Sequence, residues 1–220
     1  MGIKGFTLAE TLITLGIIGV VAALTIPALI TNHQKEVTLN KLKETYSLLG
    51  QAFKSATVEN GGDMSYLFTN SSDTDNQKFA EKFIAKNIIP YVNVIEDCGY
   101  QLTKCRGKSY TYLDNTTTGY LGVVRYGVLL KNGTFLDFVF NYGHSDATIY
   151  VDLNDKKENN KFGKDIFVMY IEQGKNGIFF DGYKLNDTQL EDNCKKGGNG
   201  RYCGALIQRN NWQFPKDYPW

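Results

Sequence analysis

The sequence of 220 residues has no excess of charge of either sign. Its 24 lysine and arginine residues nearly balance its 23 aspartate and glutamate residues, so the net charge is +1 at pH 7. Binding to nucleic acid or to an anionic membrane surface depends on a concentration of basic residues. The composition therefore gives no electrostatic case for nucleic acid as a partner. Low-complexity tracts and internal repeats are absent as well.

Histidine is scarce, and recognisable catalytic motifs are missing. The chain contains no G-x-S-x-G, no H-E-x-x-H and no phosphate-binding glycine loop. A cysteine nucleophile would need a histidine base close by, and of the two histidines, His33 and His144, only His144 is a candidate. We therefore expect a protein that is not an enzyme.

One long apolar run stands out near the start of the chain. Residues 6–30 read FTLAETLITLGIIGVVAALTIPALI and contain a single charged side chain, Glu10. The run is too long for the core of a secretory signal peptide, and no A-x-A cleavage site follows it. Its length predicts a helix that crosses a membrane. An ionisable group inside such a span is by default functional and needs a partner.

The residues at the start of this run resemble the processing site of type IV pilins and of the pseudopilins of type II secretion. The match is Lys4-Gly5-Phe6-Thr7-Leu8-Ala9-Glu10, with Gly5, Phe6 and Glu10 on the family's motif positions. In that family a membrane peptidase cuts after the glycine, and the new first residue is N-methylated. The resemblance, which covers residues 1 to about 58, thus implies a leader peptide 1–5, cleavage between Gly5 and Phe6, and methylation of Phe6.

The resemblance also implies assembly into a filament through the segment 6–30. Cleavage leaves an ammonium group at Phe6 with a pKa near 8, and the Phe6 ammonium of one subunit could pair with Glu10 of its neighbour. Gly19 and Pro27 fall where these proteins often carry helix-loosening residues. The motif does not distinguish a pilus, a secretion pseudopilus and a DNA-uptake filament.

The same resemblance implies partners and a location. The expected partners are copies of this chain and other pilin-like subunits, the prepilin peptidase, the inner-membrane assembly platform and membrane lipid. The subunit would cross the cytoplasmic membrane once, with its globular domain outside the cytoplasm, and would enter an extracellular or periplasmic filament after assembly. An alternative is a membrane-tethered extracellular ligand-binding or enzymatic domain with a plain anchor, which leaves Glu10 unexplained.

Helical periodicity continues beyond the apolar run. Apolar residues recur at steps of three and four along one stripe: Leu39, Leu42, Tyr46, Leu49, Phe53 and Ala56. Gly61-Gly62 ends the pattern, so we predict one helix from Phe6 to about Glu59, with Pro27 as a weak point. The globular domain is expected over residues 31–220, with the helix to about 59, a connecting region over 60–108 and a sheet region over 109–220.

The sheet region shows strand patterns separated by turns. The predicted strands are 109–113, 123–130, 135–140, 148–153, 166–171 and 178–183. Lys131-Asn132-Gly133-Thr134 is a strong hairpin turn between two of them. A long helix followed by antiparallel strands is an α+β fold, and it resembles the pilin architecture of a helix packed on an antiparallel sheet.

The four cysteines, Cys98, Cys105, Cys194 and Cys203, lie in the part placed outside the cytoplasm, where disulfides persist. Local pairing, Cys98 with Cys105 and Cys194 with Cys203, closes two short loops, although spacing alone leaves the two other connectivities open. A zinc site is the rival, but neither spacing is C-x2-C-like and the histidines are far off. The second pair resembles the disulfide-bounded loop near the C-terminus of many pilins.

An oxygen-rich stretch, DLNDKKENNKFGKD, spans residues 152–165. Its side chains suit a hard cation such as calcium, and the candidate ligands are Asp152, Asn154, Asp155 and Asp165. The spacing begins like an EF-hand loop and then departs from it, because Lys156 takes a ligand position. A solvated polar turn between strands is the competing interpretation, and no cofactor is otherwise expected.

Overall fold

The computed structural model describes residues 5, 7–62, 82–99, 105, 110–118, 124–140, 146–154, 160–172, 175 and 177–220. The chain divides into two units, residues 1–38 and 39–220, and each is described by itself. Of the predicted site residues, Phe6 and Asp155 lie outside the described residues.

The first helix, α1, runs from Leu8 to Glu59 and is continuous at Pro27. The predicted stripe is confirmed, since Leu42, Leu49, Phe53 and Ala56 are buried and Leu39 and Tyr46 pack against the same core. The helix ends in a Schellman motif. The N–H of Gly62 donates to Thr57 O at 2.8 Å and the N–H of Gly61 donates to Val58 O at 3.1 Å. Both glycines have positive φ.

A short helical turn precedes the first strand. Residues 82–87 are helical, and the 3-10 helix η2 follows from Ile89 to Tyr91 with Pro90 inside it. Phe83, Ile84 and Ile88 are buried, which agrees with the helical spacing of these residues in the sequence.

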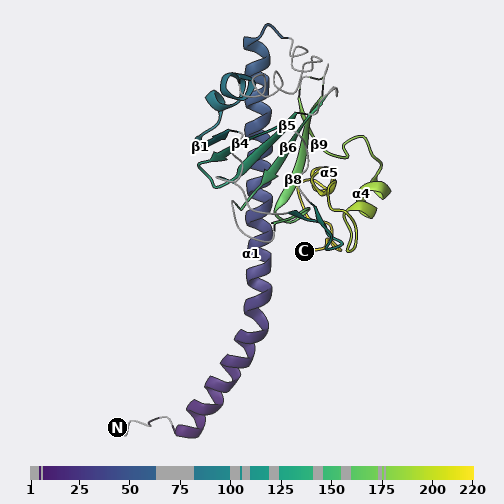
Figure 1. Cartoon of the computed structure of the whole chain (residues 1–220). Coiled ribbons are helices and arrows are strands. Elements are labelled where there is room, and N and C mark those ends of the chain that lie inside the picture. Colours follow the sequence, from purple (N-terminus) through teal and green to yellow (C-terminus); the bar gives the residue numbers. More distant parts are fainter. Residues whose placement is uncertain are drawn as a thin grey trace. The chain divides into compact units, whose positions relative to one another are not determined.

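A six-stranded antiparallel sheet forms the centre of the unit 39–220 (Figure 1). Its strands, in spatial order, are β1 (Val94–Gly99), β4 (Val124–Leu130), β5 (Phe135–Phe140), β6 (Asp146–Asp152), β8 (Ile166–Glu172) and β9 (Ile178–Phe180). The turn at Asn132-Gly133 joins β4 to β5 as predicted, with Gly133 at a φ of 77°. Strand β1 was not predicted, because it lies in the region assigned to a connection.

A second, three-stranded sheet is mixed. It contains β2 (Tyr110–Thr111), β3 (Thr117–Thr118) and β7 (Asn160–Lys161) in the order β3-β2-β7. The pair β2–β3 is antiparallel, whereas β2–β7 is parallel. A purely antiparallel arrangement therefore holds for the large sheet only.

Two short helices, not predicted from the sequence, follow the sheet: α4 (Asp187–Asn193) and α5 (Cys203–Arg209). A capping box starts α4. Asn186 Oδ1 accepts a hydrogen bond from the N–H of Gln189 at 2.9 Å, and Gln189 Oε1 accepts one from the N–H of Asn186 at 3.1 Å. This reciprocal pair satisfies two donors that would otherwise be open at the helix start.

The inner strands of the large sheet, β4, β5, β6 and β8, are covered on both faces. One face, with Leu136, Phe138 and Ile149, shares a core with the second half of α1 and with α5. The opposite face packs against the small sheet, where Val139, Tyr150 and Val168 meet Tyr110 and Phe162. Because both faces are buried, polar side chains that point outward from its strands must be satisfied inside the protein.

Candidate functional site

The start of the apolar run begins α1 with a capping box. Glu10 Oε2 accepts hydrogen bonds from the N–H and the Oγ1–H of Thr7, each at 2.8 Å, and the N–H of Glu10 donates to Thr7 Oγ1 at 3.3 Å. Thr7-Leu8-Ala9-Glu10 is the T-x-x-E signature of this motif, a signal that our sequence analysis missed. Glu10 therefore has a partner within a single chain, one turn after Gly5.

The apolar part of α1 exposes its side chains all round. Its large apolar residues, from Leu8 to Ile30, are each at least 51% exposed. Within the described residues, α1 is the one helix long and apolar enough to cross a membrane. Residues 8–30 would span about 35 Å as a helix, which exceeds the hydrocarbon thickness of a bilayer. Gly19 and Pro27, the predicted helix-loosening residues, both lie inside this stretch.

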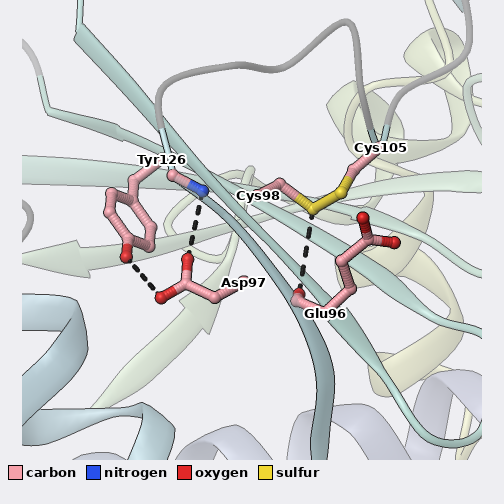
Figure 2. Close-up of a disulfide and its surroundings, with 6 residues drawn as sticks. Glu96, Asp97, Cys98, Cys105 and Tyr126 are labelled. Carbon is pink, nitrogen blue, oxygen red and sulfur yellow. Dashed lines mark hydrogen bonds between the residues drawn. A yellow bond between two sulfur atoms is a disulfide. The ribbon is translucent and has the colours of Figure 1, made fainter.

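The first cysteine pair bonds Cys98, in β1, to Cys105, with their Cα atoms 5.8 Å apart (Figure 2). Both residues are buried and pack against Leu129 and Phe135. Beside the disulfide, Asp97 ties β1 to β4, since its Oδ2 accepts a hydrogen bond from Tyr126 Oη at 2.7 Å.

The second disulfide joins Cys194, at the end of α4, to Cys203, the first residue of α5. The enclosed segment 195–202 packs closely on its surroundings. A Cβ on Gly198 would lie 2.3 Å from Asn193 O, and a Cβ on Gly200 would lie 2.8 Å from Leu113 Cγ. The N–H of Gly200 also donates to Asn193 O at 2.8 Å. Only glycine fits these two positions, so the loop has a defined shape.

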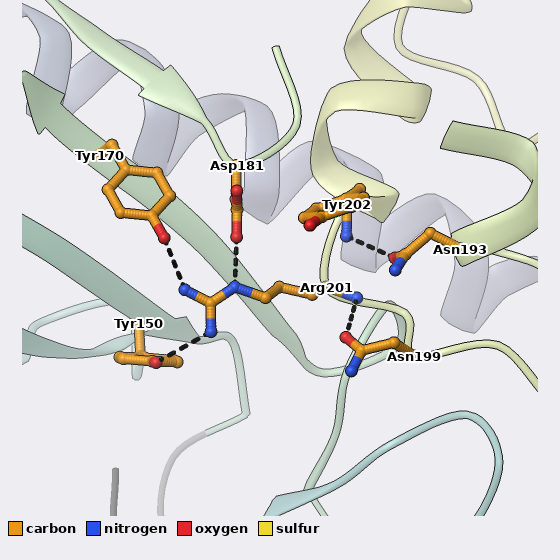
Figure 3. Close-up of polar contacts among 7 residues, drawn as sticks. All are labelled: Tyr150, Tyr170, Asp181, Asn193, Asn199, Arg201 and Tyr202. Carbon is orange, nitrogen blue, oxygen red and sulfur yellow. Dashed lines mark hydrogen bonds and ion pairs between the residues drawn. The ribbon is translucent and has the colours of Figure 1, made fainter. Parts of the chain in front are cut away.

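Arg201 anchors this disulfide loop on the large sheet (Figure 3). Its Nη2 donates to Tyr170 Oη at 2.7 Å, its Nη1 donates to Tyr150 Oη at 3.3 Å, and its Nε pairs with Asp181. The guanidinium also lies 5.7 Å from the ring centroid of Tyr150 and 6.0 Å from that of Tyr170. Burial raises the pKa of Tyr170, so its phenol keeps its proton at neutral pH.

A second arginine is buried in the same face of the sheet. Arg125 of β4 pairs with Asp137 of β5, and their side chains are 3% and 0% exposed. The guanidinium of Arg125 lies 5.3 Å from the centroid of Tyr150. Tyr150 thus contacts both arginines, the buried Arg125 from the sheet and the half-buried Arg201 from the disulfide loop.

Three of the four candidate calcium ligands, Asp152, Asn154 and Asp165, lie among the described residues. Asp152 is 1% exposed; its Oδ1 accepts from the N–H of Asn154 at 3.1 Å and its Oδ2 from Asn160 Nδ2 at 2.6 Å. Asp165 contributes its backbone carbonyl, which accepts from the N–H of Leu153. Among the residues that the structure describes, no group of three histidine, cysteine, aspartate or glutamate side chains could hold a metal ion. Calcium binding by this stretch of the sequence stays a prediction.

The fold and the N-terminal segment define an α+β protein, and α1 is the single candidate membrane-spanning helix in the part of the chain that the structure describes. A family profile described as a family of unknown function, DUF6613, matches residues 28–220, and the chain belongs to that family. The matched range begins next to Pro27 and so leaves out the capping box and most of the apolar run. No curated protein and no solved structure matches the chain.

Proposed function

We propose that this chain is a pilin-like subunit of a membrane-derived filament, processed after Gly5 and assembled through the N-terminal part of α1. The observation that carries the proposal is one glutamate, Glu10, at the start of an exposed apolar helix and five residues after a glycine. That arrangement resembles the processing site of type IV pilins and pseudopilins. The proposal does not distinguish among a pilus, a secretion pseudopilus and a DNA-uptake filament.

Charge pairing gives the proposal its mechanism. Cleavage after Gly5 would leave an ammonium group at Phe6, and a carboxylate in an apolar filament core needs such a group. The pairing of one subunit's ammonium with a neighbour's Glu10 would set the axial register between subunits. The exposed apolar side chains of residues 8–30 would be covered first by lipid and then by neighbouring helices.

A plain membrane anchor is the second candidate, and the capping box favours it. Because Thr7 donates two hydrogen bonds to Glu10, the carboxylate is stabilised within one chain and does not require a neighbour. Under this alternative the unit 39–220 would be a tethered domain that acts on a ligand.

Processing separates the two candidates. In cells that hold the prepilin peptidase and the assembly platform, the mature chain should begin at Phe6 and carry one extra methyl group, as measured by mass spectrometry of the N-terminal peptide. Gly5→Trp, which places a bulky side chain at the cut, should leave residues 1–5 attached and keep the chain out of the sheared filament fraction. An anchor would show an unprocessed N-terminus and no dependence on Gly5.

A further inference from the structure

A cavity of about 500 Å³ opens beside the disulfide loop. Four separate segments line it: residues 113–115 between β2 and β3, Lys161 and Lys164 around the end of β7, residues 196–197 of the disulfide loop, and residues 219–220. All four belong to the unit 39–220. A volume of this size lies within the usual range of small-molecule sites, roughly 300–1,000 Å³.

The charged side chains of this cavity are predominantly basic. Of the lining residues that the structure describes, three carry ammonium groups, Lys161, Lys164 and Lys196, and one carries a carboxylate side chain, Asp114. Asp114 already accepts from the N–H and the Oγ1–H of Thr116, at 2.7 and 2.6 Å. A terminal carboxylate on Trp220 would still leave the lining positive. Such a concentration of positive charge is unexpected in a chain whose net charge is only +1.

One wall of the cavity is apolar. Leu113, Pro219 and Trp220 contribute to the lining, and the indole of Trp220 is held by Phe214, with ring centroids 5.0 Å apart. Lys164 Nζ lies 5.5 Å from the centroid of Trp220. An ammonium group therefore stands next to an aromatic surface, a combination that suits a ligand with both a charged group and a ring.

The walls are fixed before any ligand arrives. Lys161 Nζ donates to Asn115 Oδ1 at 2.8 Å, which links β7 to the β2–β3 turn without neutralising the charge. The close packing of Gly200 against Leu113 joins the disulfide loop to the same turn. The hydroxyl of Tyr218 donates to Gly163 O, which ties the last residues to the turn after β7. A preformed site avoids the ordering penalty of binding.

We propose that this cavity binds a ring-shaped organic anion of monosaccharide size, through a carboxylate or a phosphate ester held by Lys161, Lys164 and Lys196 and a ring packed on Trp220. Lysine ammonium groups are point charges without a planar fork, so they accept either kind of anion. The inference does not rest on the proposed filament role, because the cavity lies wholly in the unit 39–220 and is tested on the unassembled chain.

The test uses the full chain in a nonionic polyoxyethylene detergent, which has no sugar headgroup, with glucuronate, glucose 6-phosphate and neutral glucose as probes. We expect glucuronate or glucose 6-phosphate to bind with a dissociation constant of about 1 mM. Binding should weaken as the salt concentration rises, and neutral glucose should not bind. The ligand that binds identifies the anion class. The two tryptophans are internal reporters. The indole N–H signal of Trp220 should shift, whereas that of Trp212, which packs against Tyr46 and Phe180, should not.

A neighbouring lysine provides the matched control. Lys196→Gln should weaken anion binding about fivefold. The ammonium group of Lys195 pairs with Asp192 instead of lining the cavity, so Lys195→Gln should change binding by less than about twofold. Binding of neither anion, equal binding of glucose, or equal loss in both variants would overturn the proposal. A short DNA duplex that displaces the bound anion and depends on Lys196 would also overturn it, in favour of a nucleic-acid surface.

Discussion

Arg201 donates a hydrogen bond to Tyr170 Oη at 2.7 Å, although the two residues are 31 positions apart in the chain. Arg201 belongs to the loop closed by the second disulfide, and Tyr170 belongs to β8 of the large sheet. Together with the pairing of Arg201 and Asp181, this bond holds the loop against the sheet. The position of the loop therefore depends on one guanidinium as well as on the disulfide.

Replacing Arg201 by Met should lower the free energy of unfolding by about 3 kcal/mol, because the largely buried Asp181 would lose its charged partner. Arg209→Met is the matched control. Arg209 pairs with Asp187, whose side chain is 73% exposed, so its loss should be under about 1 kcal/mol. Denaturant unfolding followed by circular dichroism measures the free energy of unfolding of both variants. Equal losses of stability would mean that the contacts of Arg201 contribute no more than an exposed ion pair.

Glu172 should make folding stability depend on acid pH. Hydrogen bonds from Lys184 and Tyr183 lower the pKa of Glu172 to about 2, below its ordinary value of about 4.3 in an unfolded chain. Between these values the folded state binds fewer protons than the unfolded state, so stability falls as the pH falls from about 4.5 towards 2. In Glu172→Gln this part of the pH dependence should vanish.

The Glu172 titration is followed by the NMR signal of its carboxylate carbon, and the stability by the melting temperature, both between about pH 4.5 and pH 2. High salt should shrink the effect, because the Glu172 side chain is 27% exposed and its charge is partly screened. A carboxylate midpoint near 4.3 in the folded protein would contradict the prediction.

Each disulfide should stabilise the unit 39–220 by about 2–3 kcal/mol, given the short loops that they close. Non-reducing peptide mapping should recover Cys98 with Cys105 and Cys194 with Cys203. The double variant Cys194→Ser, Cys203→Ser should also weaken anion binding at the cavity, because the same loop carries Lys196. Free thiols on the oxidised protein would refute the pairing.

Glu10 can be tested with variants that separate its charge from its capping role. Glu10→Gln keeps an oxygen that can accept from Thr7 but removes the charge. Thr7→Val keeps the charge and the bond from the backbone N–H, but removes both contacts of the Thr7 hydroxyl. If the Glu10 charge pairs with a neighbouring subunit, Glu10→Gln should reduce the fraction of subunit found in sheared filaments by about tenfold or more. Thr7→Val should leave that fraction unchanged. Cleavage after Gly5 should persist in both.

The pattern of loss among these variants decides the role of Glu10. If Thr7→Val reduces filament incorporation and Glu10→Gln does not, capping is the role of Glu10 and the charge-pairing mechanism is wrong. Thr14→Val serves as the control, since Thr14 also lies in the apolar run and its hydroxyl donates to the backbone carbonyls of Glu10 and Thr11. It should assemble normally.

Local pattern accounts for the elements that were predicted correctly. The stripe from Leu42 to Ala56 predicted the buried face of α1, and Asn132-Gly133 predicted the turn between β4 and β5, because helix periodicity and turn chemistry depend on residues only a few positions apart. The capping boxes at Thr7 and Asn186 were equally local. Their signatures, T-x-x-E and N-x-x-Q, are present in the sequence, although neither capping box was predicted.

Local patterns in the chain thus account for the long apolar helix, its end at Gly61-Gly62, most of the large sheet and the cysteine pairs that could form. Three features come from tertiary packing: β2 pairs in parallel with β7, Arg125 and Arg201 converge on Tyr150, and four segments line one basic cavity. These contacts join residues tens of positions apart, and no local spacing encodes them. They depend on how the second face of the sheet is covered, which is a property of the packed chain.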